Sequence, residues 1–147
     1  MIFFDFDGVL TNNTVSIDEN GIESVTCNRS DGLAFNAINK LNLRCFVLST
    51  EKNKVVSARC KKLNTKCIQG VDNKLLEVKK ISKELNIDKE GIMYIGNDIN
   101  DLEAIQYVGH SACPSDSHDL VKLNCKYILK KNGGEGIARE LIERILK

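Results

Sequence analysis

Two aspartates one residue apart, Asp5 and Asp7, are the first side chains in the sequence whose types and spacing suit chemistry. They end the apolar run at residues 2–6, which predicts a buried strand, and Gly8 breaks that strand. Because side chains alternate along a strand, Asp5 and Asp7 point to the same side. Two neighbouring carboxylates are costly without a cation or a proton between them. The pattern indicates a divalent metal site or an acid/base pair; the alternative is a solvated junction between strand and turn.

Further polar side chains follow other predicted strands or open predicted helices. Ser49 and Thr50 end the apolar segment 43–48, where a hydroxyl can donate to a phosphate oxygen or cap the next helix. Lys74 opens a predicted helix, where a lysine is ordinarily a solvated surface residue. The run GNDIND at residues 96–101 either caps a helix or supplies oxygen ligands to a cation. Carboxylates, a metal and exposed amides together are typical of phosphoryl transfer.

The run DFDGVLT at residues 5–11 resembles the first motif of the haloacid dehalogenase (HAD) superfamily of phosphatases and mutases. The resemblance implies that Asp5 is the nucleophile that takes the phosphoryl group. It also implies that Asp7 protonates the leaving group and later activates water. Gly8 lets the backbone approach closely and present its amide to the phosphate.

Two later segments resemble further motifs of the same superfamily. Ser49 matches the hydroxyl that closes the second strand and holds the phosphate, whereas Thr50 stands where near relatives carry glycine. The run QGVDNK at residues 69–74 matches the third motif, which implies that Lys74 neutralises the nucleophile and the bound phosphate. The expected catalytic residues are Asp5, Asp7 and Lys74, and the expected substrate-binding residues are Gly8, Ser49, Thr50, Glu51 and Lys74.

Residues 96–101 resemble the fourth motif, Gly-Asp-Asp-x-x-Asp, which supplies a Mg²⁺ ligand. The sequence departs from that motif because Asn97 replaces the aspartate that usually follows the glycine. An amide oxygen can bind a hard cation but brings no charge. We therefore expect either weaker Mg²⁺ binding or Asp98 in place of Asn97. The expected metal ligands are Asp5, Asp7 and Asn97, with Asp98 as the alternative to Asn97. Asp101 is expected to contact these ligands and not the metal itself.

Strand and helix patterns alternate along the chain, which favours a parallel sheet covered by helices on both faces. Buried strands are expected at residues 2–6, 43–48, 66–69, 92–95, 107–112 and 126–129. Asp31 is expected to cap a helix that buries Leu33, Ala34, Ala37, Ile38 and Leu41. Later helices are expected at residues 52–63, from 74, after 101, near 116–123 and from about 135 to 147. The resemblance implies the same α/β fold, a doubly wound, Rossmann-like HAD core with its site at the carboxyl ends of the strands.

A β-hairpin is expected directly after the first motif, because the short segments 14–18 and 22–27 flank Glu19-Asn20-Gly21. A hairpin alone is marginal in water, so this flap is expected to overhang the site and to contact another subunit. No segment is large enough for a separate cap domain, and residues 1–147 are expected to form one domain. A phosphomutase, one alternative function, needs such a cap to hold a bisphosphate.

The run GGEGIARE at residues 133–140 is either a flexible turn before a helix or a family signature. It resembles the C-terminal signature of one HAD branch. That branch contains small capless phosphatases of 3-deoxy-sugar-acid phosphates and the C-terminal modules of acylneuraminate cytidylyltransferases. The four motifs and this tail follow the order and spacing of the branch over essentially the whole chain. The resemblance implies a homotetramer in which hairpins pack together and a neighbour covers each active site.

Composition excludes several function classes. The 147 residues carry a net charge of +1, which gives no electrostatic argument for nucleic acid or an anionic membrane. No apolar run approaches the roughly 18 to 20 residues of a membrane span, and the first strand leaves no room for a signal peptide, so a cytoplasmic location is expected. Six single cysteines without a C-x-x-C pair are expected to be reduced and mostly buried. His110 and His118 have no evident partner and are expected to be structural.

These features predict a Mg²⁺-dependent phosphomonoesterase that acts on a 3-deoxy-sugar-acid phosphate through an aspartyl-phosphate intermediate. Relatives that act on the eight-carbon octulosonate 8-phosphate carry Gly-Arg after the second-motif hydroxyl, whereas this chain has Thr50-Glu51-Lys52. Glu51 can accept hydrogen bonds from sugar hydroxyls but cannot attract the substrate's own carboxylate. We therefore expect a nine-carbon nonulosonate 9-phosphate. The alternative is that Glu51 only favours the start of a helix at Lys52.

The rival function class is not enzymatic. In that class the chain is a module that oligomerises with, or supports, an acylneuraminate cytidylyltransferase. Asn97 favours this alternative, because it removes a charge from the metal site. Asp5, Asp7 and Lys74 oppose it, because the resemblance assigns a catalytic role to each of them.

Overall fold

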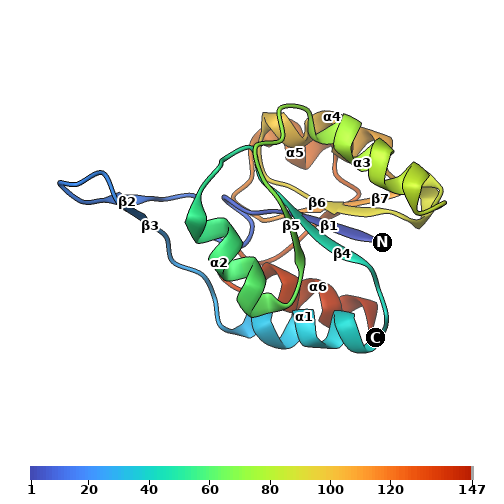
Figure 1. Ribbon diagram of the computed structural model, residues 1–147. Helices are drawn as coiled ribbons and strands as arrows, with labels where there is room; N and C mark the ends of the chain where they lie inside the picture. Colours follow the sequence, from blue (N-terminus) through green and yellow to red (C-terminus); the bar gives the residue numbers. More distant parts are fainter. Residues whose placement is uncertain (147) are drawn as a thin grey trace.

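The computed structural model describes residues 1–146 and shows a six-stranded parallel sheet between two layers of helices (Figure 1). The strand order is β5-β4-β1-β6-β7-β8. These strands are β1 (Ile2–Asp5), β4 (Cys45–Leu48), β5 (Lys66–Ile68), β6 (Met93–Ile95), β7 (His110–Cys113) and β8 (Tyr127–Ile128). The helices are α1 (Ser30–Lys40), α2 (Lys54–Leu63), α3 (Lys74–Glu84), α4 (Leu102–Tyr107), α5 (Asp119–Asn124) and α6 (Ile137–Ile145). Short 3₁₀ helices lie at Lys89–Gly91 and Ile99–Asp101.

The central strand β1 is apolar and buried on both faces, as strands of a parallel sheet must be when helices cover both sides. It pairs in parallel with β4 and with β6. On one face Phe3 stacks on Phe46, with ring centroids 5.1 Å apart, and on the other Phe4 packs against Phe35 at 5.2 Å. Asp5 ends this strand, so the expected nucleophile lies at the middle of the carboxyl edge of the sheet.

The helices divide between the two faces of the sheet. Figure 1 shows α1, α2 and α6 on one face and α3, α4 and α5 on the other. Each layer covers its own cluster of buried side chains. The doubly wound α/β fold predicted from the sequence is therefore confirmed, with no cap evident in the part of the chain that the structure describes.

The first helix differs from its prediction. Arg29 is its N-cap residue and makes no side-chain cap bond, whereas Asp31 is buried inside the first turn. The Asp31 carboxylate instead accepts a hydrogen bond of 3.3 Å from the backbone N–H of Arg139 in α6. Leu33 and Leu41 were expected to be buried but are exposed, and the buried face carries Phe35 in their place. The capping prediction was wrong because a partner distant in the sequence takes the carboxylate.

Several element boundaries also differ from the prediction. Tyr107 ends α4 and does not start a strand, and α5 begins at Asp119 and not near residue 116. The side chain of His118 caps α5 by accepting from the backbone N–H of Leu120, which is a structural role. The last helix ends at Ile145, and Lys147, where it was expected to end, lies outside the described residues.

The predicted hairpin is present as an antiparallel pair of short strands, β2 (Ser16–Ile17) and β3 (Glu23–Ser24). Figure 1 shows it extending away from the body of the protein. Both strands are exposed, and the base of the hairpin returns to the fold through a bridge between Thr11 and Cys27. All six cysteines are free thiols. Among residues 1–146, no helix has the length and apolar character needed to cross a bilayer.

Candidate active site

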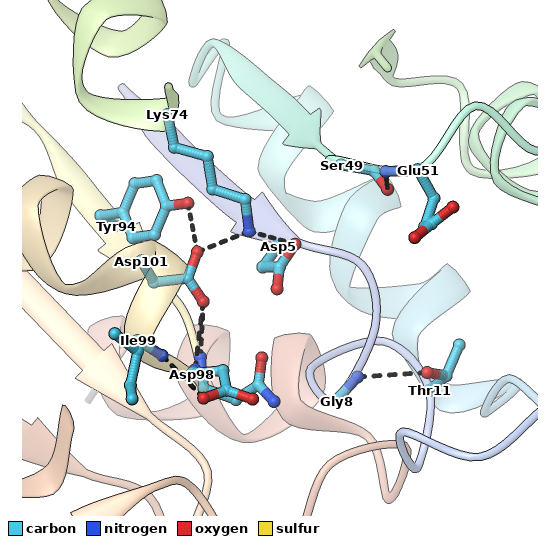
Figure 2. Close-up of polar contacts among 11 residues, drawn as sticks. Asp5, Gly8, Thr11, Ser49, Glu51, Lys74, Tyr94, Asp98, Ile99 and Asp101 are labelled. Carbon is cyan, nitrogen blue, oxygen red and sulfur yellow. Dashed lines mark hydrogen bonds and ion pairs between the residues drawn. The ribbon is translucent and has the colours of Figure 1, made fainter. Parts of the chain in front are cut away.

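The expected site residues lie around the carboxyl edge of the sheet, and Figure 2 shows Asp5, Gly8, Ser49 and Lys74 there. Asp5 ends β1, Ser49 follows β4, Lys74 opens α3 and Asn97 follows β6. These elements are neighbours in the sheet or pack on it, so segments far apart in the sequence converge. A cavity of about 290 Å³ opens there, lined by Asp5, Asp7, Asn13, Thr50, Asn97, Asp98 and Asn100.

A buried lysine bridges two buried carboxylates at this edge. The Lys74 ammonium lies 2.7 Å from Asp5 Oδ1 and 2.7 Å from Asp101 Oδ1. All three side chains are almost inaccessible to solvent. Burial alone would lower the pKa of Lys74, but the two carboxylates hold that pKa above its ordinary value, so the ammonium stays charged. When both carboxylates are ionised, one cation between two anions leaves the cluster with an excess negative charge, and burial beside Asp101 accordingly raises the pKa of Asp5 to about 8.

Asp101 is held by four hydrogen-bond donors. Its Oδ1 accepts from Lys74 Nζ and from the Tyr94 hydroxyl, each at 2.7 Å. Its Oδ2 accepts from the backbone N–H of Asn97 at 2.9 Å and of Asp98 at 3.3 Å. Sequence reasoning missed Tyr94, because a tyrosine in an apolar strand has the pattern of an ordinary core residue. The phenol is fully buried, and burial together with Asp101 and Asp5 raises its pKa, so it remains a donor.

The two aspartates of the first motif differ in their environments. Burial raises the pKa of Asp5, Asp101 raises it further, and Lys74 opposes the rise. Burial also raises the pKa of Asp7, with a contribution from Glu51. A cation beside Asp5 would favour its charged form, whereas a raised pKa at Asp7 suits a group that must hold and then release a proton.

A second cavity, of about 310 Å³, also borders Asp7 and lies between the hairpin and the start of α2. Glu51, from the loop after β4, and Glu23, from β3, both line it. The Glu23 carboxylate accepts from Asn53 Nδ2, which ties the hairpin to α2. Sequence reasoning did not identify Glu23, because nothing local relates it to residue 53. The full lining is Phe6, Asp7, Asn13, Thr14, Val15, Glu23, Val25, Thr50, Glu51, Asn53, Val55 and Val56.

The donor set facing the first cavity fits Mg²⁺. The end of the Asn97 amide lies 2.8 Å from the carbonyl oxygen of Asp7 and 3.1 Å from Asp5 Oδ2. Octahedral Mg²⁺ with ligands at 2.0–2.1 Å has adjacent ligand oxygens about 3 Å apart, so these two separations suit oxygens that share one cation. Within residues 1–146, no three His, Cys, Asp or Glu side chains form a metal-binding group. The suitable ligands are therefore one carboxylate, one backbone carbonyl and one side-chain amide.

Asp98, the alternative ligand, is engaged elsewhere. Its Oδ1 accepts from the backbone N–H of Ile99 at 2.7 Å, and it forms a reciprocal cap with Asp101 at the start of the 3₁₀ helix. The alternative interpretation of residues 96–101 as a capping cluster is thus correct for Asp98. Asp98 lines the same cavity, but it is the Asn97 amide that lies against Asp5 Oδ2 and the Asp7 carbonyl.

The residues expected to bind phosphate, Ser49 and Gly8, lie at the site, and each makes a hydrogen bond within its own loop. Ser49 is buried, and its Oγ accepts from the backbone N–H of Glu51 at 3.2 Å, while Asn53 caps α2. Ser49 therefore does not cap that helix, and its hydroxyl hydrogen is free to donate to an anion. The Gly8 amide donates to Thr11 Oγ1 at 3.2 Å, and its φ of +77° shows why glycine is needed there. Glu51 precedes α2, which begins at Lys54, so the alternative helix start at Lys52 is wrong.

A doubly wound sheet with an aspartate pair, a buried lysine and oxygens suited to a cation at one edge fits an α/β enzyme whose site stabilises negative charge. The family comparison agrees. Residues 52–141 match the model of the haloacid dehalogenase-like hydrolases, and the chain belongs to that family.

Its relatives and structural neighbours are more specific. The chain is 29% identical to the 3-deoxy-D-manno-octulosonate 8-phosphate phosphatase of Escherichia coli K12, over 99% of this chain and 78% of that protein. The phosphatase of the same name from Moraxella catarrhalis, solved with magnesium, phosphate and KDO, superposes with a TM-score of 0.95 at 29% identity, over 99% and 84% of the two chains. A HAD family hydrolase from Streptomyces avermitilis MA-4680 is 38% identical with a TM-score of 0.94, over 97% and 87% of the two chains.

Proposed function

We propose that the chain is a Mg²⁺-dependent phosphomonoesterase of sugar-acid phosphates that works through an aspartyl-phosphate on Asp5. The observation that carries the proposal is the Asp5 carboxylate, which has one oxygen 2.7 Å from the Lys74 ammonium and the other 3.1 Å from the end of the Asn97 amide. Membership of a hydrolase family and the names of the sugar-acid phosphatase relatives support it.

The chemistry assigned to the chain's own residues has two steps. In the first, the Asp5 carboxylate attacks phosphorus, the ester bond to the sugar oxygen breaks, and the Asp7 carboxyl gives its proton to that oxygen. In the second, Asp7 takes a proton from water, the water oxygen bonds to phosphorus, and the bond from phosphorus to Asp5 breaks. Lys74 and the Ser49 hydroxyl offset charge on the transferring group in both steps.

The metal is proposed to lie against Asp5, the Asp7 backbone carbonyl and Asn97. When bound, Mg²⁺ supplies positive charge to the phosphoryl oxygens, which the negative cluster around Lys74 otherwise repels. The Moraxella catarrhalis and Haemophilus influenzae phosphatases were solved with magnesium and cobalt respectively, which supports a divalent cation here.

For the substrate, we propose a nine-carbon nonulosonate 9-phosphate in preference to the eight-carbon 8-phosphate. The cavity beside Asp7 carries Glu51 and Glu23 and no lysine or arginine in its lining. Carboxylates accept hydrogen bonds from sugar hydroxyls but repel the substrate's own carboxylate. A nine-carbon acid places that carboxylate one carbon further from the phosphate ester.

We further propose a homotetramer in a reducing, cytoplasmic compartment. The exposed apolar residues of the hairpin and the six free thiols support these two parts of the proposal. The whole chain, residues 1–147, is proposed to act as one domain, because the helices of both layers cover one six-stranded sheet (Figure 1).

Phosphate release from a panel of 3-deoxy-sugar-acid phosphates, with and without Mg²⁺, tests the function. We expect Mg²⁺-dependent turnover that Asp5→Asn abolishes without unfolding the protein, because the change removes the attacking anion and keeps its shape. Asp72→Asn, at an exposed aspartate, is the matched control and should keep full activity. Near-normal activity of Asp5→Asn would rule out the covalent mechanism, and no turnover by the wild type would favour the non-enzymatic module.

The substrate preference has its own measurement. We expect a higher kcat/KM for the nine-carbon 9-phosphate than for the eight-carbon 8-phosphate, and Glu51→Ala should reduce the difference. A clear preference for the eight-carbon compound, unchanged in Glu51→Ala, would contradict this part of the proposal.

A further inference from the structure

The Asn97 amide lies in a fixed place with two possible orientations. Asn97 is buried, and its backbone N–H is held by Asp101. On its outer side the amide packs on Gly8, where an added Cβ would lie only 2.0 Å from Nδ2 and 2.5 Å from Cγ. The amide therefore has little room to move toward Gly8. Rotation about the Cβ–Cγ bond can still exchange its oxygen and nitrogen ends.

Each orientation suits a different occupancy of the site. With the oxygen inward and Asp5 ionised, the Asn97 oxygen lies 2.8 Å from the Asp7 carbonyl oxygen and 3.1 Å from Asp5 Oδ2 with no hydrogen between them, which is unfavourable for buried groups unless a cation joins them. With the nitrogen inward, the same distances are those of two hydrogen bonds, to the Asp7 carbonyl and to Asp5 Oδ2. The amide is thus the one ligand of this set that can also satisfy the other two.

We propose that the Asn97 amide closes the metal site itself in the absence of a cation, and turns to present its oxygen when Mg²⁺ binds. This inference rests on the metal dependence in the proposed function. It adds that Mg²⁺ and the Asn97 NH₂ group compete for the same two oxygens, the Asp7 carbonyl and Asp5 Oδ2. Mg²⁺ must displace two hydrogen bonds, which weakens its apparent affinity beyond the effect of the missing charge. In return, the cation-free protein carries no unsatisfied oxygens at this position.

An aspartate at position 97 could bind the metal but could not donate hydrogen bonds to the other two ligands in its absence. Its second oxygen would face Asp5 and the Asp7 carbonyl as another acceptor, and it would add a negative charge to the cluster around Lys74. We therefore expect Asn97→Asp to melt at a lower temperature than the wild type without Mg²⁺. We also expect it to bind Mg²⁺ at least tenfold more tightly and to gain more melting temperature from saturating Mg²⁺.

Two-dimensional ¹H–¹⁵N NMR of the full chain observes the amide directly. The Asn97 NH₂ signals are assigned by their loss in Asn97→Asp. Without Mg²⁺ we expect them to exchange slowly with solvent, as hydrogen-bonded protons do, and with saturating Mg²⁺ to shift and exchange at least tenfold faster. The exposed Asn100, which lines the same cavity, is the internal control, and Asn100→Asp is the matched charge control for the melting and binding measurements.

The outcomes separate this inference from the proposed function. If the wild type binds Mg²⁺ and the Asn97 NH₂ signals do not change, or if Asn97→Asp is as stable as the wild type without Mg²⁺, the inference is overturned and the phosphatase proposal stands. If the wild type neither binds Mg²⁺ nor releases phosphate, the metal dependence fails and the inference fails with it.

Discussion

Asp101 takes no chemical step in the proposed reaction, but it holds the lysine that contacts the nucleophile and the loop that carries the proposed metal ligand. Its two oxygens accept from Lys74, Tyr94 and the backbone of Asn97 and Asp98. Four donors use the roughly four lone-pair sites of a carboxylate, so none remains for a cation. The same carboxylate therefore orients the ammonium that contacts the nucleophile and the loop that carries the proposed metal ligand.

Replacing Tyr94 by phenylalanine should lower kcat about tenfold with little change in KM. A hydrogen bond to a charged group contributes on the order of 1.5–3 kcal/mol, and a tenfold rate corresponds to about 1.4 kcal/mol. Without the Tyr94 hydroxyl, Asp101 Oδ1 loses one donor and interacts more strongly with Lys74, which weakens the contact of Lys74 with Asp5. The phenylalanine ring still fills the same space beside Phe3. Steady-state kinetics check this prediction.

The control for that change is Tyr107→Phe, because Tyr107 is half-buried and contacts the Lys79 ammonium through its ring and not through its hydroxyl. We expect wild-type kinetics from it. An unchanged kcat in Tyr94→Phe would show that the phenol only fills the core. Adding Tyr94→Phe to Asp101→Asn should change kcat little further, because both act through one carboxylate.

Among single residues, the sequence predicted the site residues whose position relative to a strand or helix can be recognised from the neighbouring sequence. Asp5, Asp7 and Lys74 follow a strand or open a helix, so their convergence at one sheet edge could be predicted. Tyr94 and Glu23 could not, because each is defined by a partner that only the folded chain brings near.

Among the elements, the loop between β8 and α6 supports the loop of the first motif. Gly134 N–H donates to the carbonyl of Val9 at 3.0 Å. A Cβ on Gly133 would lie 2.2 Å from the carbonyl oxygen of Gly8 and 2.9 Å from that of Thr11. The glycines of this tail are therefore required by backbone packing beneath the site, and not by a need for a flexible turn.

Gly133→Ala should lower kcat/KM by more than tenfold while the protein still folds. The added methyl group cannot fit against the Gly8 carbonyl, so the loop carrying Asp7 must shift, and small displacements at a site are costly for rate. Gly32→Ala is the control, since nothing lies within 4 Å of a Cβ there and alanine favours a helix. Kinetics and thermal melting are measured on both. Equal activity in the two variants would refute the supporting role.

The same tail is anchored by a carboxylate in α6. Glu140 accepts from the backbone N–H groups of Lys130 and Lys131 at 2.9–3.1 Å and from the guanidinium of Arg144 at 2.6 Å. Burial would raise the pKa of Glu140, but these donors hold it below its ordinary value of 4.5. The carboxylate is thus favoured in the folded state.

Glu140→Gln should destabilise the protein at neutral pH by on the order of 1–3 kcal/mol, because the donors lose a charged acceptor. A lowered folded-state pKa stabilises above the unfolded value of 4.5 and loses that effect as pH falls through the folded value. The difference between wild type and variant should therefore be constant near pH 7 and shrink below about pH 4.5. Urea unfolding at several pH values measures it. Glu143→Gln, at an exposed glutamate, is the control, and a difference that grows on acidification would contradict the argument.

Local periodicity in the sequence predicted which segments are helices and strands. It did not predict the hydrogen-bond partners of the residues at the ends of those elements. Asp31 has the sequence pattern of a helix cap, and its true acceptor role is toward Arg139, 108 positions further along the chain. His118 looked partnerless for the same reason, although it caps the helix that it precedes.

In the whole molecule, the candidate catalytic residues lie at one edge of the sheet, and the β2–β3 hairpin extends from the body with few contacts to it. The alternating pattern predicted the sheet and its two helical layers, because buried parallel strands and amphipathic helices are both visible in sequence. What lies against the hairpin is not visible there. Val15, Ile17 and Ile22 are at least half exposed on it, and it is joined to the fold by the bridge at its base and by the hydrogen bond from Asn53 to Glu23.

The proposed tetramer accounts for this exposure and can be tested through it. Burying an isoleucine side chain contributes about 1.5–3 kcal/mol, so packed hairpins would offset the instability of each isolated one. Changing Ile17 and Ile22 together to asparagine should therefore convert a tetramer to smaller species in light scattering at micromolar concentration. Activity should fall as well, because Glu23 on the same hairpin borders the cavity beside Asp7 and would lose its support. Leu123→Asn, at an exposed leucine on α5, should leave assembly unchanged, and a wild type that is monomeric would remove the hairpin's proposed role.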